Sequence, residues 1–130
     1  MSAPSGALPT VTLEVRQQLQ FEMADFYVAN NVHFSSTLAM DQRVALYAYR
    51  QQVLVGPCNT PKPGFFELVE EVKERWAAWD ALGTMPVDAA ADRFVKCVAD
   101  ADPQWESWDG FPELHPDDVD ALASASLYAA

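Results

Sequence analysis

The sequence predicts an all-α protein with four main helices. Apolar side chains recur every three or four residues near 11–30, 41–55, 65–82 and 86–98, and no stretch alternates apolar and polar residues as a half-buried strand does. The chain has 130 residues, of which 50% are hydrophobic, so it can bury the core of one domain. We therefore expect a four-helix bundle over residues 11–98.

The first helix is expected at 11–30, after an irregular N-terminus over residues 1–10 that contains two prolines and a glycine. Its inward face is expected to carry Val15, Leu19, Met23 and Phe26. Residues 30–40 have no helical period. We expect a loop there, packed against the helices by Val32, Phe34 and Leu38.

Glycine and proline set the limits of the second helix. Asp41 suits its N-terminal end, and the pair Gly56-Pro57 must end it. The connection over residues 56–64 contains three prolines and two glycines. This composition excludes both a helix and an inner strand.

The third helix is expected at 65–82, and the fourth begins near Pro86. The most regular apolar spacing in the chain belongs to the third helix and is carried by Leu68, Val72, Trp76 and Trp79. Pro86 suits the first turn of the fourth helix, and Asp88 suits its positive end. The inward stripe of this helix is expected to consist of Ala90, Phe94 and Val98.

Residues 99–130 are expected to form an acidic tail that contains aromatic residues. Residues 1–98 hold 11 acidic and 8 basic side chains, whereas residues 99–130 hold 8 acidic and none that is basic. A short helix is expected within the tail at 117–126. The rings of Trp105, Trp108 and Phe111 either fold back over the bundle or dock on a basic, apolar groove of a partner.

Charge and missing motifs exclude several classes of function. The formal net charge of −11 opposes binding to nucleic acid or to anionic membranes. No phosphate-binding glycine loop, zinc-binding helix motif or serine nucleophile elbow occurs, so we expect no catalytic residue, metal or cofactor. Cys58 and Cys97 are expected to be reduced thiols. Without a secretory leader or a long apolar run, we expect a cytoplasmic protein.

Two groups of side chains could bind an anion. Tyr47, Arg50 and Gln51 are spaced i, i+3 and i+4, so they share one helical face that could hold a phosphate and stack a base. Alternatively, Tyr47 is simply half-buried beside solvated polar residues. Lys73 and Arg75 precede two tryptophans in the third helix. Four glutamates surround this basic pair, so an anion site there must be local.

The order of these motifs resembles the acyl-CoA-binding protein family over about residues 21–98. The family pattern Tyr-x-x-Tyr-Lys-Gln of the second helix is matched in spacing by Tyr47, Arg50, Gln51 and Gln52. The family's Lys-Trp-x-x-Trp is similar to Arg75-Trp76-x-x-Trp79, although the stretch from Gly64 to Trp76 is about two residues longer than usual. Phe94 falls on a tyrosine of the fourth helix. The resemblance implies a bundle with up-down-down-up topology.

The resemblance also implies which side chains bind the ligand. The first tyrosine and the lysines of the second and third helices would gather the 3′-phosphate of coenzyme A, while aromatic rings seat adenine. Gln51 supplies no charge, and Arg50 replaces that charge only if its side chain curls back, because one residue rotates the helix by about 100°. Arg75 keeps its charge, and Phe94 keeps a ring without the hydroxyl. The expected ligand-binding residues are Tyr47, Arg50, Gln51, Lys73, Arg75 and Phe94.

The resemblance thus implies a non-catalytic carrier that binds medium- to long-chain fatty acyl-CoA reversibly, buffers and transports it, and releases it to acyl-CoA-using enzymes. We expect a monomer with no nucleic-acid partner and no stable membrane insertion. The alternative is an interaction module on the same fold, with a weakened ligand site, that acts through the acidic aromatic tail.

Overall fold

The computed structural model describes residues 14–112, and within them the chain is helical and contains no strand. The helices are α2 (Val15–Asn30), α3 (Val32–Ser36), α4 (Met40–Leu54), α5 (Glu70–Ala81) and α6 (Val87–Ala101), followed by the 3-10 helix η1 (Trp105–Ser107). None of these helices is long and apolar enough to cross a membrane. The all-α prediction is confirmed. The N-terminus at 1–10 and the helix expected at 117–126 lie outside the described residues.

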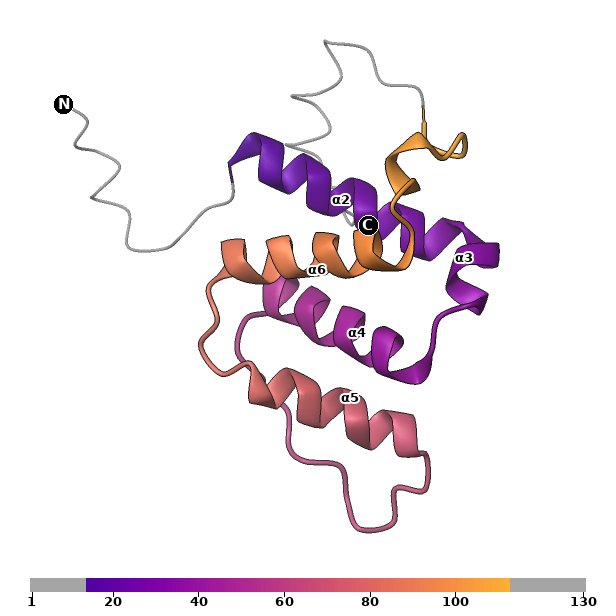
Figure 1. The fold of residues 1–130 in the computed structure, drawn as a ribbon. Helices are drawn as coiled ribbons and strands as arrows, with labels where there is room; N and C mark the ends of the chain where they lie inside the picture. The colour runs from indigo at the N-terminus through magenta and orange to yellow at the C-terminus, as the bar shows by residue number, and fades with distance from the viewer. Residues whose placement is uncertain (1–13, 113–130) are drawn as a thin grey trace, which may run out of the picture.

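The four long helices lie side by side in the order α2, α6, α4 and α5 (Figure 1). α6 packs against both α2 and α4, and α5 packs against α4. Their connections make α2 and α6 run one way and α4 and α5 the other (Figure 1). The topology is therefore up-down-down-up, as the family resemblance implied.

The centre of the core is the apolar stripe of α6. Ala90, Phe94 and Val98 are at most 1% exposed, as their spacing predicted. The ring of Phe94 meets that of Phe21 of α2 edge-on, with centroids 5.0 Å apart. Leu46 of α4 joins the same cluster. One stripe of α6 therefore joins α2 and α4, which flank it.

The buried face of α2 differs from the predicted one. The residues of α2 that are buried are Phe21, Glu22, Ala24, Asp25 and Tyr27. Val15, expected on this face, is 52% exposed. Glu22 accepts a hydrogen bond from Gln18, at 2.9 Å, and Asp25 accepts one from Arg50, also at 2.9 Å. Leu19, Met23 and Phe26 of the predicted stripe are half-buried, and Met23 packs against the core, so the stripe was only partly right. The most buried face was missed because two buried carboxylates interrupt its apolar period.

The stretch expected to be a loop at 30–40 contains the short helix α3. The carboxamide oxygen of Asn31 accepts a hydrogen bond from the backbone N–H of Phe34, at 3.0 Å, and caps this helix. Phe34 and Leu38 are buried as expected, but Val32 is 75% exposed. The Ser35 hydroxyl donates to a backbone carbonyl of α2 and so fastens α3 to it.

The end of α4 and the start of α6 lie close to the glycine and proline residues that predicted them. α4 ends at Leu54, and Gly56 then takes a φ of 106°, which favours glycine. Pro86 lies just before α6, not within its first turn, and its carbonyl accepts a hydrogen bond from the N–H of Ala90 at 2.9 Å. Asp88 lies in the first turn, as expected.

α5 begins at Glu70, five residues later than predicted. Phe65 and Leu68 continue the apolar spacing of the helix, but they are 92% and 89% exposed in the preceding loop. Neither side chain has a helix opposite it. The predicted start was wrong because helical spacing there is not accompanied by burial.

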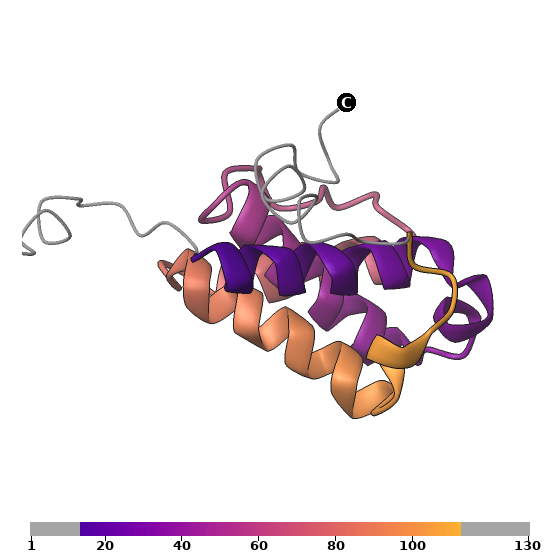
Figure 2. The same ribbon diagram turned by 90° about the horizontal axis from the view of Figure 1, so that it is seen from above.

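The segment after α6 folds back along the C-terminal end of α2 (Figure 2). Trp105 is 2% exposed, and its ring centroid lies 6.1 Å from that of Tyr27. The rings of Trp108 and Phe111 lie 5.2 and 6.1 Å from the same tyrosine. Of the two interpretations of these rings, the structure shows packing over the bundle.

A hydrogen bond joins this segment to the core. The Tyr27 hydroxyl donates to the carboxylate of Asp102. Burial and this carboxylate together raise the pKa of Tyr27 to about 12. The phenol therefore remains a hydrogen-bond donor in the folded protein even somewhat above its ordinary pKa of 10.

We expect Trp105→Ala to lower the free energy of unfolding by about 3–5 kcal/mol, because a large aromatic side chain leaves the core. Urea unfolding followed by circular dichroism would measure the loss. Phe66→Ala is the matched control, since Phe66 is 85% exposed, and it should change stability by less than about 0.5 kcal/mol. Equal effects of the two substitutions would contradict the packing of Trp105.

Candidate functional site

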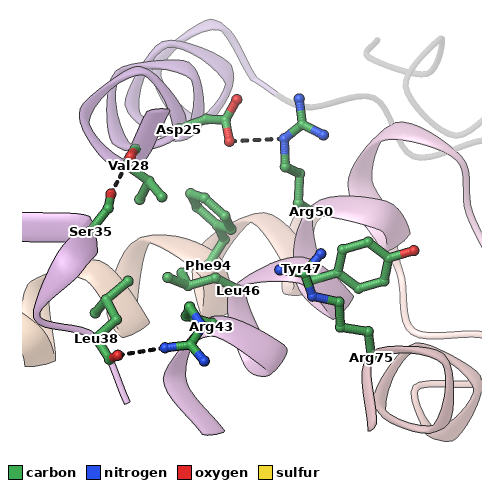
Figure 3. A pocket seen from close by; sticks show the side chains of 10 residues that line it. All are labelled: Asp25, Val28, Ser35, Leu38, Arg43, Leu46, Tyr47, Arg50, Arg75 and Phe94. Atoms are coloured by element: carbon green, nitrogen blue, oxygen red, sulfur yellow. Dashed lines mark hydrogen bonds and ion pairs between the residues drawn. The ribbon is translucent and has the colours of Figure 1, made fainter. Parts of the chain in front are cut away.

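A cavity of about 200 Å³ opens between α2, α4, α5 and α6 (Figure 3). α4 supplies four of its ten lining residues, spaced so that they share one face: Arg43, Leu46, Tyr47 and Arg50. The others come from the remaining helices and the turn before α4: Asp25, Val28, Ser35, Leu38, Arg75 and Phe94. The cavity therefore exists only when all the helices are packed.

The cavity has an apolar floor and a charged rim. Phe94 lies at its centre beside Leu46 (Figure 3), and both side chains are buried. Arg43, Arg50 and Arg75 surround this floor. An apolar floor beneath several guanidinium groups suits a ligand that has a flat ring and anionic groups.

Glu71 of α5 holds two of the three arginines. Its carboxylate accepts hydrogen bonds from Arg43 at 2.7 and 3.2 Å and from Arg75 at 2.9 Å. The hydrogen bond from Arg43, followed by that from Arg75, lowers the pKa of Glu71. Arg43 also donates to the carbonyl of Leu38 at 2.8 Å. Guanidinium groups from two different helices thus converge on one carboxylate.

Arg75 lies over the ring of Tyr47, with its guanidinium carbon 5.1 Å from the ring centroid. The Nε atom of Arg75 is buried and, among the described residues, has no hydrogen-bond partner. The ring of Tyr47 also meets that of Trp79, with centroids 6.5 Å apart and the ring planes almost at right angles. The aromatic stack fixes the position of Arg75 at the rim.

Arg50 is paired with Asp25 across the gap between α4 and α2, at 2.9 Å. The sequence predicted that the Arg50 side chain could supply the charge that Gln51 lacks. In the structure this side chain pairs with a carboxylate. With Glu71 included, three guanidinium groups and two carboxylates leave the site with one net positive charge. An anionic ligand must therefore compete with acidic side chains for the arginines.

Four of the six predicted ligand-binding residues line the cavity: Tyr47, Arg50, Arg75 and Phe94. Gln51 and Lys73 do not line it. The ammonium group of Lys73 lies 3.6 Å from the carboxylate of Glu70. Arg43 was missed, although its position four residues before Tyr47 on the same helical face could have revealed it.

A second cavity, of about 290 Å³, shares Tyr47 and Arg75 with the first. Its other lining residues are mostly apolar: Thr60, Pro61, Pro63, Val72 and Trp76. The indole N–H of Trp76 donates to the carbonyl of Thr60 at 2.9 Å and holds the loop against α5. The two shared side chains therefore line both the cavity that three arginines border and the one whose only charged lining residue, within the part of the chain that the structure describes, is Arg75.

Outside the two cavities, the groups that could bind a metal or react are the acidic side chains, the histidine and the two cysteines of the described residues. Between residues 14 and 112, no three His, Cys, Asp or Glu side chains cluster as metal ligands would. Cys58 and Cys97 are free thiols, and burial raises the pKa of Cys97.

The chain is similar to proteins of one family. A family model described as "Acyl CoA binding protein" matches residues 18–98. The chain is 44% identical over 92 residues to acyl-CoA-binding domain-containing protein 6 of Xenopus tropicalis, covering 71% of this chain and 30% of that protein. It is 49% identical over 67 residues to acyl-CoA-binding domain-containing protein 4 of Arabidopsis thaliana, covering 52% and 10%.

A third relative is named as an enzyme. The chain is 45% identical over 115 residues to enoyl-CoA delta isomerase 2 of Homo sapiens, covering 82% of this chain and 28% of the relative. The chain thus spans less than a third of the length of these curated relatives.

Glu71→Gln should remove a part of the protein's acid sensitivity. Because the pKa of Glu71 is lowered in the folded state, its ion pairs contribute stability above its ordinary value of 4.5 and lose it as pH falls through the folded value. We expect the melting temperatures of the wild type and the variant to differ most near neutral pH and to converge in acid.

Glu74→Gln, which changes an exposed glutamate of the same helix, is the matched control for thermal melts across this pH range. A difference between Glu71→Gln and the wild type that stayed constant from neutral pH into acid would contradict the role of Glu71.

Proposed function

Because this chain belongs to the acyl-CoA-binding protein family, we propose that it is a non-catalytic carrier of medium- to long-chain fatty acyl-CoA esters. Reversible binding in the cytoplasm would buffer these esters, transport them and deliver them to acyl-CoA-using enzymes. The observation that carries the proposal is the three-arginine cavity, which shares Tyr47 and Arg75 with a largely apolar one.

The proposed head-group site is the charged cavity. Tyr47, Arg50 and Arg75 would bind the phosphate groups, and the buried ring of Phe94 would support adenine. Arg43 adds a cation that the family pattern did not suggest. Phosphate oxygens would replace the carboxylates of Asp25 and Glu71 as hydrogen-bond acceptors, so that no arginine loses its partner on binding.

Gln51 and Lys73 keep a more distant role in the proposal. Gln51 directly follows Arg50, and Lys73 lies two residues before Arg75. Neither residue lines the charged cavity itself. Their long side chains could reach phosphates that extend beyond the rim. We therefore expect them to contribute less than the residues that line the cavity.

The acyl chain is proposed to lie between α4 and α5. The second cavity presents Pro61, Pro63, Val72 and Trp76 next to the shared pair. Each methylene group that leaves water contributes about 0.8 kcal/mol before ordering costs. Apolar contact can thus offset the charge that Gln51 does not supply.

Arg50→Gln should weaken binding of palmitoyl-CoA by about 10- to 100-fold, because one charge-assisted hydrogen bond to phosphate is lost. Gln51→Ala should change it by less than about threefold, because a neutral hydrogen bond is worth less. Arg93→Gln is the matched control, since it removes the same charge from an exposed position on α6 and should leave binding nearly unchanged.

Arg50→Gln also leaves Asp25 without its arginine, which the double variant Asp25→Asn/Arg50→Gln corrects. If the double variant recovered the affinity of the wild type, the loss would come from the unpaired carboxylate, and Arg50 would have no direct role. Titration calorimetry measures all four variants.

Affinity should rise with acyl-chain length. Titration calorimetry below the micelle concentration should give weak binding for acetyl-CoA, intermediate binding for octanoyl-CoA and submicromolar one-to-one binding for palmitoyl-CoA. Free coenzyme A and palmitate serve as controls, and both should bind far more weakly. Equal affinity for acetyl- and palmitoyl-CoA would contradict the proposed acyl site, and absence of all binding would contradict the carrier function.

A further inference from the structure

Three large apolar side chains stand almost fully exposed on the loop between α4 and α5. Phe65, Phe66 and Leu68 are 92%, 85% and 89% exposed, and together they are called the apolar tip below. The loop that carries them extends beyond α5, at the edge of the bundle opposite α2 (Figure 1). Single exposed apolar residues are ordinary, but a contiguous group marks a docking surface.

Hydrogen bonds hold this part of the loop in a defined shape. The N–H of Glu67 donates to the carbonyl of Gly64 at 3.0 Å, and the carboxylate of Glu67 accepts from the N–H of Val69 at 3.0 Å. The rings of Phe65 and Phe66 meet edge-on at 5.2 Å. The apolar tip is therefore presented to solvent by a structured turn.

We propose that the apolar tip docks the protein reversibly on an electrically neutral lipid surface. The three side chains are almost fully exposed, so they can enter the fluid interfacial layer without a preformed pocket and bury their apolar area there. Such shallow docking differs from stable insertion, because only side chains of one loop leave water.

Charge decides which surface the tip fits. Glu67 lies within the tip, and four acidic side chains stand against two basic ones over residues 62–74. The basic ones are Lys62, which precedes the tip, and Lys73, which pairs with Glu70 at 3.6 Å. The chain as a whole carries a net charge of −11. An anionic membrane and a second copy of this chain are both repelled by these charges. Zwitterionic headgroups, as in phosphatidylcholine, are not.

The chain's own terminal segments begin on the far side of the bundle. The described chain starts at residue 14, next to α2, and Phe111 near its other end packs against Phe26 of α2. α5 is the long helix farthest from α2 in the bundle (Figure 1). Residues 113–130 also contain no basic side chain that could pair with the glutamates. A lipid surface fits the tip better than either terminal segment.

Docking at this loop would bring the second cavity to the lipid. Pro61 and Pro63 line that cavity and precede the apolar tip on the same loop. An amphiphile leaving the lipid would meet this cavity first. Docking itself does not require the proposed ligand, so the two proposals can be tested separately.

Cosedimentation with phosphatidylcholine vesicles tests the proposal. We expect the wild-type protein to bind these vesicles and Phe65→Ser/Phe66→Ser to bind at least about tenfold more weakly, since two large apolar side chains are lost. The matched control is Val15→Ser/Val32→Ser, which changes residues that are 52% and 75% exposed on α2 and α3. It should bind within about twofold of the wild type.

Several results would overturn the proposal. These are no binding of the wild type to phosphatidylcholine vesicles, an equal loss in the control variant, or binding that strengthens when phosphatidylserine is added. Sedimentation velocity without lipid could give a further contradicting result. If the wild type were a dimer and Phe65→Ser/Phe66→Ser a monomer, the tip would bind a second copy of the chain. Lack of vesicle binding would leave a protein surface as the occupant.

Two measurements separate this proposal from folding and from ligand binding. Thermal melting should be unchanged in Phe65→Ser/Phe66→Ser, because both side chains lie in solvent. Calorimetric affinity for palmitoyl-CoA below its micelle concentration should also match the wild type. Lost vesicle binding with intact ligand binding supports the proposal, whereas a parallel loss of both contradicts a separate docking role.

Discussion

The site depends on how Trp79 attaches α5 to α4. Trp79 is the one fully buried residue of α5, and its indole N–H donates to the carbonyl of Gly56, just beyond the end of α4, at 2.8 Å. Gln52, which is 0% exposed, makes a second attachment by donating to two carbonyls in the turn after α5, at 2.9 and 3.1 Å. These hydrogen bonds join α4 to α5 and to the turn after it, and of the residues of α5 only Trp79 is buried. Because Arg75 lies on α5 and Tyr47 on α4, their stacking depends on this attachment.

Ion pairs prepare the charged cavity and also limit its charge. The guanidinium groups of Arg43 and Arg75 are held on Glu71, and that of Arg50 on Asp25. These arginine side chains are about 40% exposed, so solvent screens their pairs with Glu71, whereas the carboxylate of Asp25 that pairs with Arg50 is buried. Exchanging Glu71 for a phosphate therefore costs little, whereas the same exchange at Arg50 takes from the buried carboxylate of Asp25 its ion-pair partner. The acids hold the arginines at the rim of the cavity, so that fewer rotamers would be lost if an anion bound there.

The sequence was sufficient to predict the elements whose limits are local. α4 and the inward stripe of α6 follow from a Gly-Pro stop and from apolar spacing, and both are confirmed. The start of α5 was not predictable from spacing, because Phe65 and Leu68 mimic a helical stripe that no neighbour covers. The buried face of α2 was missed for the opposite reason, because it contains two carboxylates. Glu22 is hydrogen-bonded to Gln18 on the same helix, and Asp25 is hydrogen-bonded to Arg50 on α4. Spacing reports which residues share a face, whereas burial depends on what packs against it.

The same distinction applies to the cavities. That Tyr47 and Arg50 share a face of α4 can be deduced from their spacing in the sequence. Spacing alone does not give the lining, because Gln51 at i+4 does not line the cavity, whereas Arg43 does. The carboxylates that hold the arginines cannot be deduced from spacing either, because Glu71 and Asp25 meet them only after α5 and α2 have packed against α4. The lining of two cavities by one Tyr47–Arg75 pair is likewise a product of packing. Since both side chains line both cavities, a ligand whose head and tail occupied one cavity each would contact the same pair with both of its parts. Interactions of the two parts would then be coupled through one stacked pair, so their contributions to affinity would not be independent.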